Sequence, residues 1–281
     1  MKVVQMIRRL WCTCCAWLVG VALLGAVIAT NVCFTQRAIP PTTGTDSPTL
    51  SAVLVALGGC RGIISEVLWW RIADLQRQNR YAELVPLTDL LVALDPASAD
   101  TWVYNAWNLS YNISAAHQDA DEKWYWVKEG IALLERGLRA APRATPILRQ
   151  LGWMFEDKLG GSSDVAAPYY RAHIMELGVP ADASAFAAAT GVTPNWQDPF
   201  VRALYWYWRA GHGRDMLRIT LVLVANRDQA AWLPFLIQMA RAEWEDLAPR
   251  QRDQVVHFFR QLSGTHVAHP AIQAFLEEVS P

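Results

Sequence analysis

Charged residues are scarce in this sequence of 281 residues. Asp, Glu, Lys and Arg make up 18% of it, whereas 53% of the residues are hydrophobic and the mean hydropathy is +0.10. A disordered chain is more polar than this, so disorder of the whole chain is excluded. A basic excess is also missing, because the formal net charge is −1. We therefore expect no nucleic acid among the partners.

Cysteine is rare and unevenly placed. Four of the five cysteines, Cys12, Cys14, Cys15 and Cys33, lie near the start of the chain, and only Cys60 follows. One thiol cannot form an internal disulfide, so the remaining part must be stable through its hydrophobic core. Cysteines beside an apolar segment are typically small apolar side chains or acylation sites, so we predict no metal there.

The common catalytic motifs are missing too. The sequence has no glycine-rich phosphate loop, no HExxH, no GxSxG and no cysteine with a plausible base. Glu156 and Asp157 are adjacent, and neighbouring helical side chains diverge too far to act on one bond. His266 and His269 lack an evident third metal ligand. We predict no enzyme activity, no metal site and no cofactor.

What the sequence does have is a long apolar segment near its start. Residues 10–36 contain no charge, and about 20 apolar residues are enough to cross a bilayer core. Three basic residues lie within residues 1–9 and only Arg37 follows closely, which predicts a cytoplasmic N-terminus. We predict a transmembrane signal anchor over residues 10–36. A signal peptide cleaved after Ala29 is the alternative.

A polar linker follows the predicted anchor. Residues 37–49 are rich in Pro, Thr, Gly and Ser, and the folded part is expected to begin near Leu50. Four of the 25 basic residues and none of the 26 acidic ones lie in residues 1–37, so the remainder is mildly acidic. Such a domain is not suited to bind anionic lipid or nucleic acid.

Helix signals recur through the rest of the chain, and strand signals do not. A proline in the first turn marks four helix starts, at Thr145-Pro146, Asp198-Pro199, Ala248-Pro249 and His269-Pro270. Between such marks, apolar residues recur at helical spacing, as in Ile131, Leu134 and Leu138. We predict an all-α fold of roughly ten or more helices in antiparallel neighbouring pairs.

Consecutive helical pairs share one spacing. The first pair ends at Asp95-Pro96, and each of the next two opens with a large residue six positions after a closing proline. Their matching positions are Trp102, Ala106, Gly130 and Gly137 in one pair, and Leu148, Leu151-Gly152 and Phe155 in the next. Small residues let paired helices approach closely. This spacing resembles the tetratricopeptide repeat (TPR).

The resemblance covers about residues 62–180. It implies an antiparallel helical-hairpin array, a TPR-like α-solenoid, which we assign to residues 50–180. Residues 181–281 look like degenerate C-terminal helical repeats of the same kind. The second pair departs from the pattern, because it carries about a dozen extra residues around residues 114–122. Pro86 and Pro168 lie within second helices, which are therefore expected to start late or kink.

Three short motifs point to one group among the proteins with such repeats. Leu57–Gly62, Trp69–Arg71 and the stretch from Trp102 to Ser114 are similar to those of a group of membrane-anchored bacterial envelope proteins with such repeats. This resemblance implies a single-pass protein of the bacterial inner membrane whose C-terminal domain faces the periplasm. It implies little chemistry, because the biochemical role of that group is not well defined.

One polar constellation interrupts the apolar pattern. Asn105, Asn108 and Asn112 recur at helical spacing, although Asn is a poor interior helix former. One interpretation is a buried ladder of amide hydrogen bonds that fixes the helix register. The other is a polar groove with an aromatic rim that binds an extended partner segment. The second interpretation gives seven candidate partner-binding residues: Asn105, Trp107, Asn108, Tyr111, Asn112, Trp124 and Trp126.

Two functions of different classes follow. The first is a membrane-anchored periplasmic scaffold that binds another envelope or membrane protein complex through its helical array. The alternative is an envelope protein that binds or hydrolyses glycan or peptide in an aromatic groove. Of the 12 tryptophans that follow residue 36, most are expected at the seams between helices: Trp69, Trp70, Trp102, Trp107, Trp153, Trp206 and Trp208.

Overall fold

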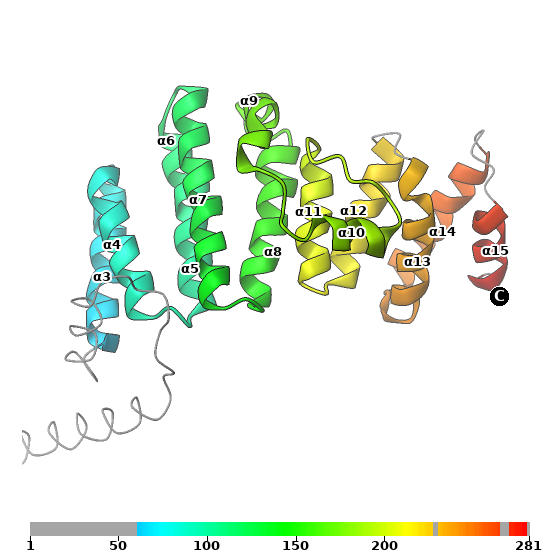
Figure 1. Cartoon of the computed structure of the whole chain (residues 1–281), viewed down its shortest axis with the longest axis horizontal. Helices are drawn as coiled ribbons and strands as arrows, with labels where there is room; N and C mark the ends of the chain where they lie inside the picture. Colours follow the sequence, from blue (N-terminus) through cyan, green and yellow to red (C-terminus); the bar gives the residue numbers. More distant parts are fainter. Residues whose placement is uncertain (1–60, 227–229, 265–269, 280–281) are drawn as a thin grey trace, which may run out of the picture. The chain divides into compact units, whose positions relative to one another are not determined.

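The computed structural model describes residues 61–226, 230–264 and 270–279 (Figure 1). All regular structure in these ranges is helical, so the all-α prediction is confirmed there. The predicted cytoplasmic segment 1–9, anchor 10–36 and linker 37–49 lie outside the described residues. Within the described ranges, no helix is both long and apolar enough to span a bilayer.

The chain divides into two compact units, residues 1–98 and 99–281. The described part of the first unit is a pair of packed helices, α3 (Arg61–Arg77) and α4 (Tyr81–Leu94). The connection turns through Asn79, whose φ of 57° lies in the left-handed region that Asn tolerates. Pro86 lies inside α4, so the helix neither starts late nor stops at this proline.

The second unit is a succession of helices, several of which are joined end to end. In chain order they are α5 (Ala99–Trp107), a π-helical segment (Asn108–Ile113), α6 (Ser114–Ala116), α7 (Ala120–Ala140), α8 (Thr145–Trp153), a second π-helical segment (Met154–Gly160), α9 (Ala167–His173), a 3₁₀ turn (Ile174–Leu177), α10 (Ala183–Thr190), α11 (Pro199–Arg209), α12 (Gly213–Asn226), a 3₁₀ turn (Ala230–Trp232), α13 (Leu233–Glu243), a 3₁₀ turn (Trp244–Asp246), α14 (Pro249–Gly264) and α15 (Pro270–Val279). We call residues 99–116 helix A1 and residues 145–160 helix A2, because each runs on without a break.

Helical pairs follow one another along this unit (Figure 1). A1 packs on α7, A2 on α9, and α11 on α12. Helices that lead successive pairs also touch: α5 contacts α8, and α8 contacts α11. The extra residues predicted around 114–122 lengthen A1 and α7 and leave only a short connection between them. Pro168 lies in the first turn of α9, so this helix starts late, as predicted.

Glycines mark the closest helix contacts. A Cβ atom added at Gly130 of α7 would lie 2.8 Å from the carbonyl oxygen of Ala106, and one at Gly137 would lie 2.9 Å from the Trp102 ring. At Gly152 the added atom would lie 2.6 Å from the ring of Tyr207. Since no real Cβ is this close to its neighbours, the small residues read from the repeat spacing do lie where helices meet.

The four predicted proline-marked starts are confirmed, since α8, α11, α14 and α15 begin at or one residue before the proline. Their capping differs. The Asp198 carboxylate accepts a hydrogen bond of 2.9 Å from the Phe200 amide, a regular N-cap. Thr145 is not the cap of α8, because the helix already includes it and the preceding Ala144 has no side-chain acceptor.

Candidate functional site

The three asparagines of A1 occupy different environments. Asn105 is buried and its Nδ2 donates to the Thr101 carbonyl at 2.8 Å. Asn108 is buried too, and its Oδ1 accepts a hydrogen bond of 2.8 Å from Nδ2 of Asn112, which is half-buried. The amide contact expected of a ladder therefore joins Asn108 to Asn112, whereas Asn105 bonds to the backbone. Direct contact of Asn105 or Asn108 with a partner would require the core to open.

A π-helical segment carries this polar group into the core. Residues 108–113 include Asn108 and Ser110, both fully buried, and neither the Asn108 Nδ2 nor the Ser110 Oγ has a hydrogen-bond partner among the described residues. Ser110 lies against Gly130 of α7, where a methyl group would collide with its hydroxyl. π-Helical turns inside α-helices are frequent at functional sites, so this part of A1 is a candidate site.

Two aromatic residues of A1, Tyr104 and Trp107, are exposed, whereas Trp102 is buried. The rings of Trp107 and Tyr111 stack at 5.9 Å with an interplanar angle of 17°, and Tyr104 lies 6.5 Å from Trp107. Trp107 exposes 39% of its surface and Tyr104 exposes 42%. The expectation that Trp107 packs at a seam is wrong, and the same holds for Trp153 and Trp70, which are 44% and 66% exposed.

Trp153 and Asp157 of A2 converge on Tyr111. The Tyr111 hydroxyl donates to Oδ2 of Asp157 at 3.1 Å. Burial, with help from the Asp157 charge, raises the pKa of Tyr111 far above its ordinary value, and the nearby Trp153 side chain opposes this only in part. Tyr111 is therefore a neutral donor at any physiological pH. We call Tyr104, Trp107, Tyr111 and Trp153 the aromatic row.

A buried ion pair lies beneath the row. Lys158 of A2 places its Nζ 5.0 Å from the centre of the Tyr111 ring and 2.6 Å from Oδ2 of Asp164. Tyr170 of α9 also donates to Oδ2 of Asp164, at 3.1 Å. Burial alone would raise the pKa of Asp164, but Lys158 and the Ala166 amide outweigh it and leave that pKa below the ordinary value.

The other side of A2 is also polar. The Glu156 carboxylate accepts a hydrogen bond of 2.9 Å from Tyr207 of α11 and pairs with Arg218 of α12. Arg218 also reaches Oδ1 of Asp215 at 3.3 Å, and Arg149 lies 3.4 Å from Oδ2 of the same carboxylate. As predicted from their adjacency, Glu156 and Asp157 point to different partners and do not face one reacting bond.

The two tryptophans predicted on α7 lie elsewhere. Trp124 is buried, stacks on Tyr170 at 5.7 Å and donates from Nε1 to Glu176 at 3.0 Å. Trp126 is half-buried and stacks on His117 at 5.9 Å. The structure thus brings together Trp107 and Tyr111 of the seven candidates, with Asn112 on the same helix, and gives Trp124 and Trp126 other neighbours.

Tyr104, Trp153 and Asp157 are the residues that sequence reasoning missed. A signal for Trp153 exists in the repeat spacing. Trp153 follows Trp107 by the same interval, 46 residues, that separates Tyr111 from Asp157. The repeat register that pairs Ala106 with Gly152 therefore also pairs Trp107 with Trp153. Reading the exposed positions of the repeat, and not only its packing positions, identifies the second tryptophan.

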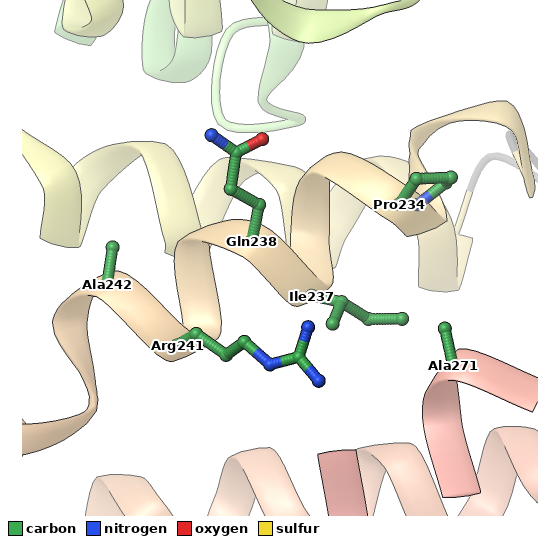
Figure 2. A pocket seen from close by; sticks show the side chains of 6 residues that line it. All are labelled: Pro234, Ile237, Gln238, Arg241, Ala242 and Ala271. Atoms are coloured by element: carbon green, nitrogen blue, oxygen red, sulfur yellow. The ribbon is translucent and has the colours of Figure 1, made fainter. Parts of the chain in front are cut away.

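A shallow groove lies apart from these residues, between α13 and α15. It is lined by Pro234, Ile237, Gln238, Arg241, Ala242 and Ala271. Figure 2 shows Ile237 and Arg241 on the side of α13 that faces Ala271, with Gln238 on the other side. Arg241 is already paired with Glu278 at 2.8 Å. With no other charged group in its lining, this groove has no convergent set of polar groups for chemistry.

Comparisons of the chain with family models, with curated proteins and with solved structures find no match. Within the described ranges, no group of three or more His, Cys, Asp or Glu side chains is placed to hold a metal ion. His266 and His269 lie outside the described residues. The candidate site among the described residues is the aromatic row with Asp157 beside it.

Proposed function

We propose that this protein is a membrane-anchored periplasmic scaffold that holds another envelope protein through the aromatic row. The observation that carries the proposal is the exposure of Trp107 and Trp153 on the leading helices of two consecutive pairs. Tryptophan and tyrosine supply most of the binding energy in many protein interfaces, because they bury a large area with few rotatable bonds. The proposal includes no enzyme activity and no cofactor.

The contacts that hold Tyr111 in place favour a binding role for the aromatic row over a role in packing. Tyr111 is fixed by Trp107 on its face, by Asp157 at its hydroxyl, and by Lys158. Side chains held in this way lose little conformational entropy when a partner docks. TPR-like arrays present such surfaces on helices that lead each pair, so the repeat spacing and the exposed row support the same proposal.

The anchor is part of the proposed mechanism. An apolar, uncharged segment over residues 10–36, with its basic residues on the N-terminal side, would confine the scaffold to the inner membrane. Confinement raises the effective concentration of the array toward partners in the same membrane, so a modest interface suffices. Protease accessibility in spheroplasts tests the orientation, because a periplasmic array is cleaved from outside.

The docking surface is tested by co-purifying the full-length protein from detergent after cross-linking in cells. We expect one reproducible partner with the unaltered chain and its loss with Trp107→Ala combined with Trp153→Ala. Trp70→Ala is the control, since it removes a tryptophan of α3 that is even more exposed than Trp107 and Trp153. Retention of the partner by the double variant, with its helical content unchanged, contradicts the proposed surface.

The same exposed rings would also stack on sugar, which is the alternative function. Calorimetry with envelope saccharides distinguishes the glycan-binding function from the scaffold. Saccharide binding that the double variant loses, without any protein partner, would favour the glycan-binding function over the scaffold.

A further inference from the structure

A carboxylate without a cation borders the aromatic row. Asp157 is half-buried, and its carboxylate accepts a hydrogen bond from Tyr111. Within the described part of the chain, no basic side chain forms an ion pair with it. The neighbouring Lys158 points to Asp164 at 2.6 Å.

The other nearby cations are also engaged. Arg218 pairs with Glu156 and with Asp215, and Arg149 lies beside Asp215. The two adjacent carboxylates of A2 thus differ: Glu156 forms an ion pair with Arg218, whereas Asp157 forms none among the described residues and lies beside exposed aromatic rings. A negative charge at the edge of such a surface favours a cation and disfavours an anion.

We propose that the row recognises a cationic side chain, arginine or lysine, of the partner segment. This rests on the proposed function and names the chemistry of its partner. The cation would approach Asp157 while lying over the exposed rings of Trp107, which stacks on Tyr111, and of Trp153, which lies near the Tyr111 hydroxyl. Cations are attracted to the faces of aromatic rings, and tryptophan is the best of these.

Arginine fits this arrangement better than lysine. Its planar guanidinium stacks on an indole and also presents paired donors to a carboxylate, whereas the ammonium of lysine is a strongly hydrated point charge. An acidic or phosphorylated segment does not fit, because the described cations around the row are paired with carboxylates of the chain.

The probe is a set of four blocked pentapeptides that differ only in a central arginine, citrulline, lysine or glutamate. Citrulline keeps the shape of arginine and removes its charge. Binding to the full-length protein in detergent is followed by NMR of the indole N–H groups, with Trp107→Phe and Trp153→Phe used for assignment. We expect the arginine peptide to shift both signals, with about tenfold weaker binding of citrulline.

Asp157→Asn tests the carboxylate directly. It keeps an oxygen that accepts from Tyr111, so the fold should persist, and we expect about tenfold weaker binding of the arginine peptide. Glu129→Gln is the control, because it removes an exposed carboxylate from α7. Equal binding of arginine and citrulline, no effect of Asp157→Asn, or no shift with any peptide overturns the inference.

The two proposals fail separately. If partner capture in cells is lost in the double tryptophan variant but unchanged in Asp157→Asn, the docking surface stands and the preference for a cation is wrong. If the double tryptophan variant retains the partner, the docking surface itself is wrong.

Discussion

The hydroxyl of Tyr207 donates a 2.9 Å hydrogen bond to Glu156, and in this way α11 is joined to helix A2. Tyr111 does the same from the other side, through Asp157 at 3.1 Å. Helix A2 is therefore held between two tyrosines from the leading helices on either side of it. Both bonds have a carboxylate acceptor, which makes them stronger than neutral ones.

Replacing Tyr207 by Phe should lower the free energy of unfolding of the second unit. Tyr207 is buried and its hydroxyl donates to a charged acceptor. We therefore expect the free energy of unfolding to fall by about 1.5–3 kcal/mol. Urea unfolding followed by circular dichroism measures it. A double-mutant cycle with Glu156→Ala, which removes the acceptor, isolates the pair, and a coupling energy near zero would show that this bond does not stabilise the helix contact.

Removing Lys158 should be more damaging, because Asp164 would be left buried without its cation. The side chains of the two residues are only 6% and 11% exposed. Breaking a buried pair from one side costs about 3–5 kcal/mol, whereas replacing both partners costs much less. We therefore expect Lys158→Met to be strongly destabilised and Lys158→Met with Asp164→Asn to recover part of the loss in thermal melts. An equal loss in both variants would contradict this.

The sequence predicted the helices well because their signals are local. Prolines at helix starts and glycines at helix contacts act through backbone geometry and close approach, and Pro199 and Gly152 lie where these rules place them. The exposure of a tryptophan is not local. Trp102 is buried and Trp107 is exposed although they lie on one helix, because only one of them faces α7 and α8.

The sequence predicted only part of the candidate site, because the exposure of a side chain and its contacts with distant residues are not local properties. Hydrophobicity alone suggests that every tryptophan packs inside, and closeness in the sequence alone groups Trp124 with Trp126. The structure separates that pair, because positions two apart on a helix point in different directions. The contact of Asp157 with Tyr111 joins residues from successive pairs, and no local pattern in the sequence predicts it.

Gly152→Ala should destabilise the contact between α8 and α11. The added methyl would lie 2.6 Å from a carbon of the Tyr207 ring, and overpacking of this kind typically costs about 1–3 kcal/mol. Gly62→Ala is a suitable control, since Gly62 lies in α3 with no atom within 4 Å of the added carbon. There the higher helix propensity of alanine should raise stability slightly. Similar changes in stability at both positions would show that the close approach of α11 does not require a glycine at position 152.

Stability should fall at alkaline pH, beginning near pH 10. Burial, together with neighbouring carboxylates, raises the pKa values of Tyr111, Tyr170, Tyr205 and Tyr207 well above the ordinary value. In the unfolded chain these hydroxyls lose their protons at about pH 10, whereas the folded chain retains them. The free energy of unfolding therefore decreases as the pH rises.

One buried group acts in the opposite sense. Burial lowers the pKa of Arg202 to about 10, so its deprotonation would favour the folded state above that pH. Four tyrosines outweigh it, and we expect the free energy of unfolding to decrease from pH 9 to pH 11 in urea titrations. Tyr207→Phe should reduce this slope, because phenylalanine has no proton to lose. A slope that is flat in the unaltered chain, or unchanged in the variant, would mean that these hydroxyls ionise equally in the folded and unfolded states.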